Sequence, residues 1–146
     1  MRKQNVNTGL AMEDFFHDRS EAALHKQVAW LKRNLGFRNT FFSHLLNIDE
    51  TAFTRWMNRQ DKLATTQLDT LQAFWVLHLR ILALFDFDLS KVRQAYTNVD
   101  QSLNTAYGNV PPWKGTSLEA FIERRGTRAI KEAGAWLHRL RFAEAY

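Results

Sequence analysis

The chain reads FFSHLLNIDETAFTRWMNRQDK from residue 41 to residue 62, and this stretch decides the fold of its first half. Two short apolar segments flank Asn47, a residue type that adopts the left-handed backbone conformation more readily than most. Ser43 is small where two helices would cross closely, and Phe53 and Trp56 have the spacing of one buried helix face. The pattern therefore predicts a helix-turn-helix.

The second helix of this motif, Glu50 to about Arg59, leaves a polar stripe facing outward. In a helix-turn-helix protein such a stripe faces the major groove of DNA, where Arg suits guanine, Asn suits adenine and Thr suits several base edges. The residues predicted to read bases are Thr51, Thr54, Arg55, Asn58 and Arg59. The residues predicted to contact phosphates are Arg38, Asn39, Thr40, Lys62, Thr65 and Thr66.

The charge of the chain favours polyanionic partners only mildly. It has 20 Lys and Arg against 15 Asp and Glu, which gives a net charge of +5. Two of the acids, Asp49 and Glu50, begin the second helix, where a phosphate would approach, and they equally suit helix capping. The arginines of the stripe equally suit a solvated helix face.

The rest of the chain predicts further helices and almost no strand pattern. Ser20 is a good N-cap, Gly36 ends the helix that follows, and the longest apolar helix runs from Thr65 or Thr66 to Phe85. We therefore expect an all-α fold of about seven helices. The expected parts are a partly ordered segment 1–19, a helix-turn-helix domain 20–88 and a C-terminal helical domain 89–146.

Composition excludes several classes of protein. With 146 residues, of which 45% are hydrophobic, the chain is long and apolar enough for a packed core. It contains no Cys, which excludes disulfides and thiolate metal sites. No stretch has the length and apolarity of a membrane span and no secretory signal is evident, so we expect a cytoplasmic protein with no membrane partner.

The sequence offers little that would carry catalysis. The five His residues form neither an H-x-x-x-H nor an H-E-x-x-H pattern, and no glycine-rich phosphate-binding loop or nucleophile elbow is present. We therefore expect no enzyme activity, no catalytic residues, no metal site and no cofactor.

Two regions together resemble a known protein family. The first is the helix-turn-helix around Asn47, and the second contains Trp113-Lys-Gly-Thr-Ser-Leu118, Phe121-Ile122, Gly126, Ala129-Ile130 and Trp136-Leu137. Over roughly residues 35 to 140 the chain resembles antitoxins of the Xre/ParS-like family, which pair with RES-domain toxins. The resemblance implies a homodimer that binds double-stranded DNA at its own promoter, and a cognate RES-domain toxin that degrades NAD.

The resemblance also implies how a toxin would be held. Family members place C-terminal residues at the entrance to the toxin's active site. Trp113, beside Pro112 in an expected loop, would add an anchor for a partner if exposed, or would otherwise fold onto the core. The predicted partner contacts are Trp113, Trp136, Arg139, Arg141 and Tyr146.

These observations favour an antitoxin-like transcriptional repressor. It would bind operator DNA through the second helix of the motif and a toxin through its C-terminal part. An alternative is a protein-binding module in which the helix-turn-helix serves only as a scaffold or dimerisation unit.

Overall fold

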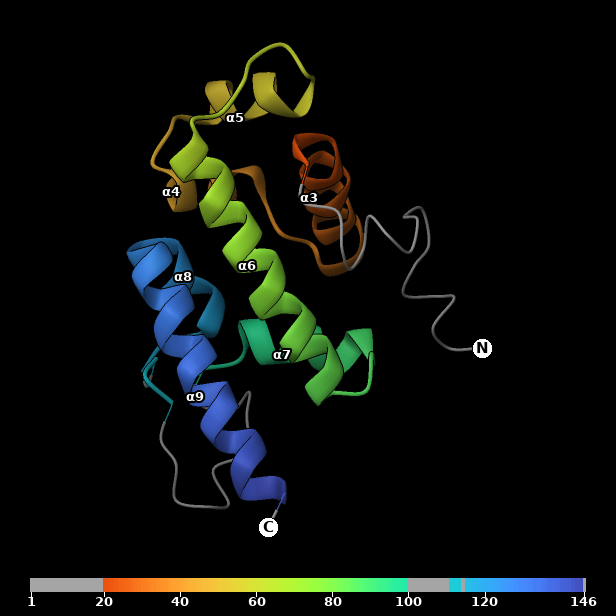
Figure 1. Cartoon of the computed structure of the whole chain (residues 1–146), viewed down its shortest axis with the longest axis vertical. Coiled ribbons are helices and arrows are strands. Elements are labelled where there is room, and N and C mark those ends of the chain that lie inside the picture. Colours follow the sequence, from red (N-terminus) through yellow and green to blue (C-terminus); the bar gives the residue numbers. More distant parts are fainter. Residues whose placement is uncertain (1–19, 100–110, 114, 146) are drawn as a thin grey trace. The chain divides into compact units, whose positions relative to one another are not determined.

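The computed structural model describes residues 20–99, 111–113 and 115–145, with side chains described as far as residue 139. Within these ranges the chain forms seven α-helices, and the β-type pairing there is a single isolated bridge between Val99 and Ser117 (Figure 1). The expected all-α fold of about seven helices is thereby confirmed. Among the helices of the described ranges, none combines the length and apolarity needed to cross a membrane. The expected segment 1–19 lies outside the described residues.

The chain divides into two compact units, residues 1–75 (unit 1) and residues 76–146 (unit 2). This division falls inside the long helix α6, Thr65–Leu84, and not between residues 88 and 89 where we expected a boundary. The physical reason is that α6 is apolar over most of its surface. Leu71 and Phe74 are buried in unit 1, and Ile81 and Leu82 are buried in unit 2. The two parts of α6 therefore contribute buried side chains to different units.

Unit 1 consists of α3 (Glu21–Leu35), α4 (Asn39–Leu46), α5 (Glu50–Met57) and the first part of α6. The ends of α3 follow the predicted signals. Ser20 Oγ accepts a hydrogen bond from the Ala23 amide at 3.1 Å, and Gly36 ends the helix with φ at 77°. The short connection after Gly36 then turns the chain into the helix-turn-helix segment.

Aromatic side chains fill the core of unit 1. The Phe37 ring lies 4.7 Å from the Phe41 ring and 5.6 Å from the Phe74 ring, centroid to centroid. Phe42 of α4 and Phe53 of α5 stack at 5.3 Å with 10° between their planes. All five side chains are buried, and truncating a buried Phe to Ala typically costs about 3–5 kcal/mol. This cluster therefore holds α4 and α5 together.

Unit 2 consists of the rest of α6, α7 (Leu89–Thr97), α8 (Leu118–Arg125) and α9 (Thr127–Ala145). Trp113, Phe121 and Trp136 pack in its core, with the Trp113 ring 6.1 Å from the Phe121 ring and 5.3 Å from the Trp136 ring. The indole Nε1 of Trp113 is buried and has no hydrogen-bond partner among the described residues. Trp113 thus packs in the core of unit 2 with one buried N–H group left without a hydrogen bond in the described part of the chain, which lowers the stability that its burial provides.

A buried His–Tyr pair also lies in unit 2. His78 is fully buried, its Nδ1 lies 2.9 Å from the Tyr96 hydroxyl oxygen, and the two rings stack at 5.9 Å. Burial lowers the pKa of His78 from 6.5 to about 3, because the charged ring loses its hydration, and burial raises the pKa of Tyr96 for the same reason. The His78 ring is therefore neutral at physiological pH.

This pair predicts that unit 2 loses stability in mild acid. The unfolded chain binds a proton at His78 below pH 6.5, whereas the folded chain resists protonation until about pH 3. Stability is thus fully present above pH 6.5 and falls between these values with a slope that approaches about 1.4 kcal/mol per pH unit. Urea unfolding followed by circular dichroism at pH 7, 6 and 5 measures this slope.

Two substitutions separate His78 from other titrating groups. In His78→Gln the side chain retains hydrogen-bonding groups but cannot take up a proton, so we expect a flatter dependence on pH. His138→Gln removes an exposed histidine of the same unit and should leave the wild-type slope. If the unfolding free energy of His78→Gln depended on pH as steeply as that of the wild type, the conclusion that the buried His78 ring is neutral would be wrong.

Candidate nucleic-acid interface

The predicted helix-turn-helix forms between α4 and α5, and the steric positions of the motif are confirmed. Asn47 has φ at 57°, the left-handed conformation expected of it, and its amide donates to the His44 carbonyl at 3.1 Å. The next amide, of Ile48, donates to the Ser43 carbonyl at 3.0 Å. Ser43 is buried, and its hydroxyl donates to the Thr40 carbonyl at 3.1 Å. The turn is thus held by backbone bonds and one small side chain.

Helix α5 is held from behind by α3, through contacts that the sequence did not reveal. The indole Nε1–H of Trp56 donates to Glu21 Oε2 at 2.7 Å, and the Trp56 ring stacks on His25 at 4.0 Å. His25 also places Nε2 2.7 Å from the Trp56 carbonyl oxygen and Nδ1 2.9 Å from the Glu21 carbonyl oxygen. Because a carbonyl oxygen only accepts, the protonated ring donates to both, whereas a neutral ring donates to one.

The outward face of α5 carries the side chains that we predicted to read bases. Phe53 and Trp56 are fully buried. Because the opposite face of the helix must then point outward, Thr51, Thr54 and Arg55 share that side, and all three are exposed. The structure therefore brings most of the predicted stripe together.

The end of α5 differs from the prediction. The helix ends at Met57, two residues before Arg59, because Asn58 forms the C-cap and Arg59 has φ at 61°. Asn58 is exposed and its amide still donates to the Thr54 carbonyl at 3.0 Å, so it lies at the edge of the stripe. Arg59, which we expected beside the stripe at the end of the helix, lies beyond the end of α5 and lines a pocket beside α3.

Arg55, the main candidate for base recognition, is engaged by Asp61. Arg55 Nε donates to Asp61 Oδ2 at 2.7 Å, and the two side chains are 53% and 44% exposed. The hydrogen bond and the attraction between the charges raise the pKa of the Arg55 guanidinium, and the same hydrogen bond lowers the pKa of the Asp61 carboxyl. A base edge that binds Arg55 must therefore displace or share this carboxylate.

The acids at the start of α5 have a local role. Asp49 is the N-cap residue, and its Oδ1 accepts a hydrogen bond from the Ala52 amide at 2.7 Å. The capping alternative considered for Asp49 is thus confirmed. Glu50 is exposed in the first turn, where a negative charge interacts favourably with the helix dipole.

The candidate phosphate contacts lie at two helix starts and in one loop. Arg38 and Thr40 are exposed at the start of α4, and half-buried Asn39 accepts a hydrogen bond from Lys32 Nζ. Sequence reasoning missed this role of Lys32, which comes from α3 and adds a positive charge beside the cluster. Three further exposed candidates lie before or at the start of α6: Lys62, Thr65 and Thr66.

The predicted partner contacts near the C-terminus are only partly available. Trp113 and Trp136 are 1% and 2% exposed, so their assignment to a partner-binding surface is wrong. The physical reason is that their rings pack against each other in the core of unit 2. Arg139 is exposed on α9, whereas the Arg141 side chain and Tyr146 lie outside the described part of the chain.

The turn gives a direct test of the motif. Asn47→Val places a β-branched residue in the left-handed conformation and should destabilise unit 1 by about 1–2 kcal/mol. Asn47→Gly, which adopts the same conformation freely, should change stability by a few tenths of a kcal/mol. Amide hydrogen exchange of α4 and α5 measures both effects. Equal destabilisation by both substitutions would show that the amide side chain, and not the backbone conformation, matters.

No protein-family model, no curated protein and no solved structure matches this chain.

Proposed function

We propose that this chain binds double-stranded DNA through α5 and acts as an antitoxin-like transcriptional repressor. The observation that carries the proposal is the exposed polar stripe on the second helix of the helix-turn-helix, formed by Thr51, Thr54, Arg55 and Asn58. In this type of motif the second helix enters the major groove. The residue types of the stripe match base edges: Arg pairs with guanine and Asn with adenine.

The surroundings of the stripe support an approach to the DNA backbone. The exposed basic residues Arg38 and Lys62 lie at the start of α4 and in the loop before α6, together with the exposed hydroxyls of Thr40, Thr65 and Thr66. Arg, Lys and Thr side chains commonly bind phosphate oxygens and thereby set the register of a protein on the duplex.

A homodimer belongs to this proposal. One helix of eight residues, such as α5, reaches only a few base pairs, and helix-turn-helix proteins commonly pair two half-sites about one DNA turn apart. Two copies would supply the additional contacts needed for specific binding. The resemblance to Xre/ParS-like antitoxins adds a RES-domain toxin as the second partner, with exposed Arg139 as the available contact among the predicted residues.

One observation favours the alternative, a protein-binding module in which the helix-turn-helix is only a scaffold. The Arg55–Asp61 ion pair satisfies the stripe's one helical arginine within the chain, so that face could remain solvated. The two functions differ in a simple way. A DNA reader requires the Asp61 carboxylate to be displaced or shared, whereas a scaffold uses the ion pair as it stands.

Fluorescence anisotropy tests the proposal directly. The protein is titrated into a labelled duplex from the region upstream of its own gene and into a scrambled duplex, each at two salt concentrations. We expect a preference for the native duplex of about 10³-fold or more. Weak, equal binding that is lost on adding salt would contradict the proposal, because generic charge attraction has that behaviour.

The Arg55–Asp61 pair predicts opposite effects from its two members. Arg55→Ala should weaken specific binding by about 1–3 kcal/mol and relax the choice of base at one position. Asp61→Asn should strengthen binding, because it removes a competing negative charge from the guanidinium. Arg93→Ala, which removes an exposed arginine of α7, is the control and should leave affinity unchanged. If Asp61→Asn weakened binding as Arg55→Ala does, the carboxylate would be a positioning group and not a competitor.

We expect Lys62 to affect how DNA affinity depends on salt, and not which bases are preferred. Lys62→Ala should weaken the native and scrambled duplexes about equally and lower the slope of log affinity against log salt by about one. Lys91→Ala, an exposed lysine of α7, should leave the slope unchanged. Anisotropy at four salt concentrations gives both slopes, and an unaltered slope for Lys62→Ala would remove Lys62 from the phosphate contacts.

A further inference from the structure

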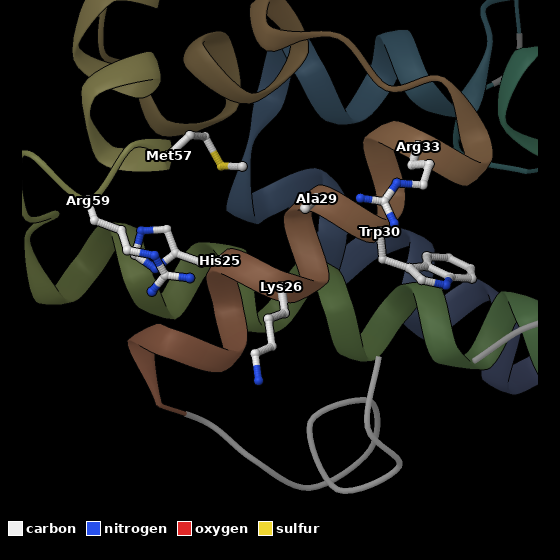
Figure 2. Close-up of a pocket in the computed structure, with 7 residues that line it drawn as sticks. All are labelled: His25, Lys26, Ala29, Trp30, Arg33, Met57 and Arg59. Carbon is white, nitrogen blue, oxygen red and sulfur yellow. The ribbon is translucent and has the colours of Figure 1, made fainter. Parts of the chain in front are cut away.

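A pocket of about 240 Å³ lies between α3 and the residues at the end of α5 (Figure 2). Its described lining residues belong to unit 1: His25, Lys26, Ala29, Trp30, Arg33, Met57 and Arg59. Among these described residues, Lys26, Arg33 and Arg59 carry positively charged side chains, and none is Asp or Glu. The described lining is therefore basic, which distinguishes it from the outer face of α5 with its Asp49 and Asp61.

The positive charges reach the pocket from two walls. Lys26 and Arg33 are seven residues apart on α3, which places them on the same side of the helix, about 10 Å apart along its axis. Arg59 comes from the opposite wall, beyond the C-cap of α5 (Figure 2). Because opposite charges attract, an anion that enters between the two walls is attracted from both sides.

The end of α5 holds the backbone of Arg59, because the amides of Arg59 and Gln60 donate to the Trp56 and Arg55 carbonyls at 2.9 Å each, as is usual where a helix ends in a left-handed residue. Its φ of 61° lies in the left-handed region, which Gly and Asn adopt more readily than other residues. Arg59 is exposed, and among the described residues its side chain takes part in no ion pair. The exposed Arg59 side chain therefore projects from a backbone that the end of α5 fixes in place.

We propose that this pocket binds a phosphate group. A guanidinium presents a planar fork of N–H donors that matches two phosphate oxygens, and Arg33 and Arg59 supply one fork from each wall. Ala29 and Met57 add apolar surface for a small group attached to the phosphate. The volume is below the range of about 300–1,000 Å³ that is typical of pockets for drug-sized ligands, so it suits a phosphate with a small substituent.

The phosphate has two possible carriers with the same chemistry. One is a free phosphate ester, and the other is a backbone phosphate of a duplex. The site is not part of the outer stripe of α5, because it is lined by Met57 and Arg59 and by α3, and not by Thr51, Thr54 or Arg55. Phosphate binding at this pocket therefore does not require DNA binding through the outer stripe of α5.

Nuclear magnetic resonance with inorganic phosphate as the probe tests the site. The full chain, labelled with ¹⁵N, is titrated with sodium phosphate and, separately, with sodium chloride at matched ionic strength and pH. We expect saturable shifts confined to the amides near Lys26, Arg33 and Arg59, with phosphate and not with chloride. Shifts that are absent, or that spread over basic residues of both units, would overturn the proposal.

Three charge-removing variants assign the binding to the pocket. Arg33→Gln and Arg59→Asn should each weaken phosphate binding by about tenfold, as expected for the loss of a hydrogen bond to a charged group. The second substitution also retains a residue that tolerates the left-handed conformation. Arg93→Gln is the matched control, because Arg93 is an exposed helical arginine outside the pocket, and it should bind phosphate like the wild type. Equal losses in all three variants would mean an adventitious ion only and would overturn the proposal.

The same variants identify the carrier. If the phosphate belongs to a duplex, Arg33→Gln and Arg59→Asn also weaken duplex binding, and inorganic phosphate competes with DNA. If the carrier is a free ester, both variants bind the duplex like the wild type, although their binding of inorganic phosphate is weaker. Because the phosphate titration contains no DNA, its failure and a failure of specific DNA binding are separate results.

Discussion

The position of Trp56 is the constraint on which both candidate binding surfaces of unit 1 depend. Its side chain is fully buried, its indole N–H is bound by Glu21, and its ring stacks on His25 at 4.0 Å. These contacts fix the rotation of α5 about its own axis, because a helix has one orientation in which this face is buried. The outward direction of Thr51, Thr54 and Arg55 follows from that orientation.

Two carboxylates beside α5 weaken the attraction of this helix for polyanions. Asp49 caps the helix and Asp61 holds Arg55, so two carboxylates lie beside the predicted base-reading residues. Exposed carboxylates of this kind weaken generic attraction to DNA, while a base edge that satisfies Arg55 better than Asp61 does is still accepted. If α5 binds DNA as proposed, this arrangement favours selectivity between DNA sites over affinity for any one of them.

Local features of unit 1 were predictable from the sequence, whereas contacts between distant segments were not. Ser43, Asn47 and Phe53 act within one helix or turn, so their spacing alone indicated the motif. The contact between His25 and Trp56 joins residues 31 apart, and no local pattern marks it. The burial of Trp113 likewise depends on α8 and α9 packing together, which the residues beside Pro112 do not reveal. The ion pair of Arg55 with Asp61 forms because α5 ends at Met57 and the chain then turns back. The sequence predicted a helix as far as Arg59, and from that prediction the ion pair could not be expected.

The early end of α5 also connects the two proposed sites. The Trp56 carbonyl oxygen lies 2.7 Å from His25 Nε2 and accepts a hydrogen bond from the Arg59 amide at 2.9 Å, so His25 and Arg59 both contact this oxygen. His25 and Arg59 both line the pocket, while Trp56 fixes α5. An anion that attracts the Arg59 side chain therefore acts on a residue whose backbone amide is hydrogen-bonded to Trp56, the residue that fixes the orientation of α5. Since a ligand shifts a conformation only by its differential affinity for the two states, coupling between the sites requires that this carbonyl geometry differ between empty and occupied pockets.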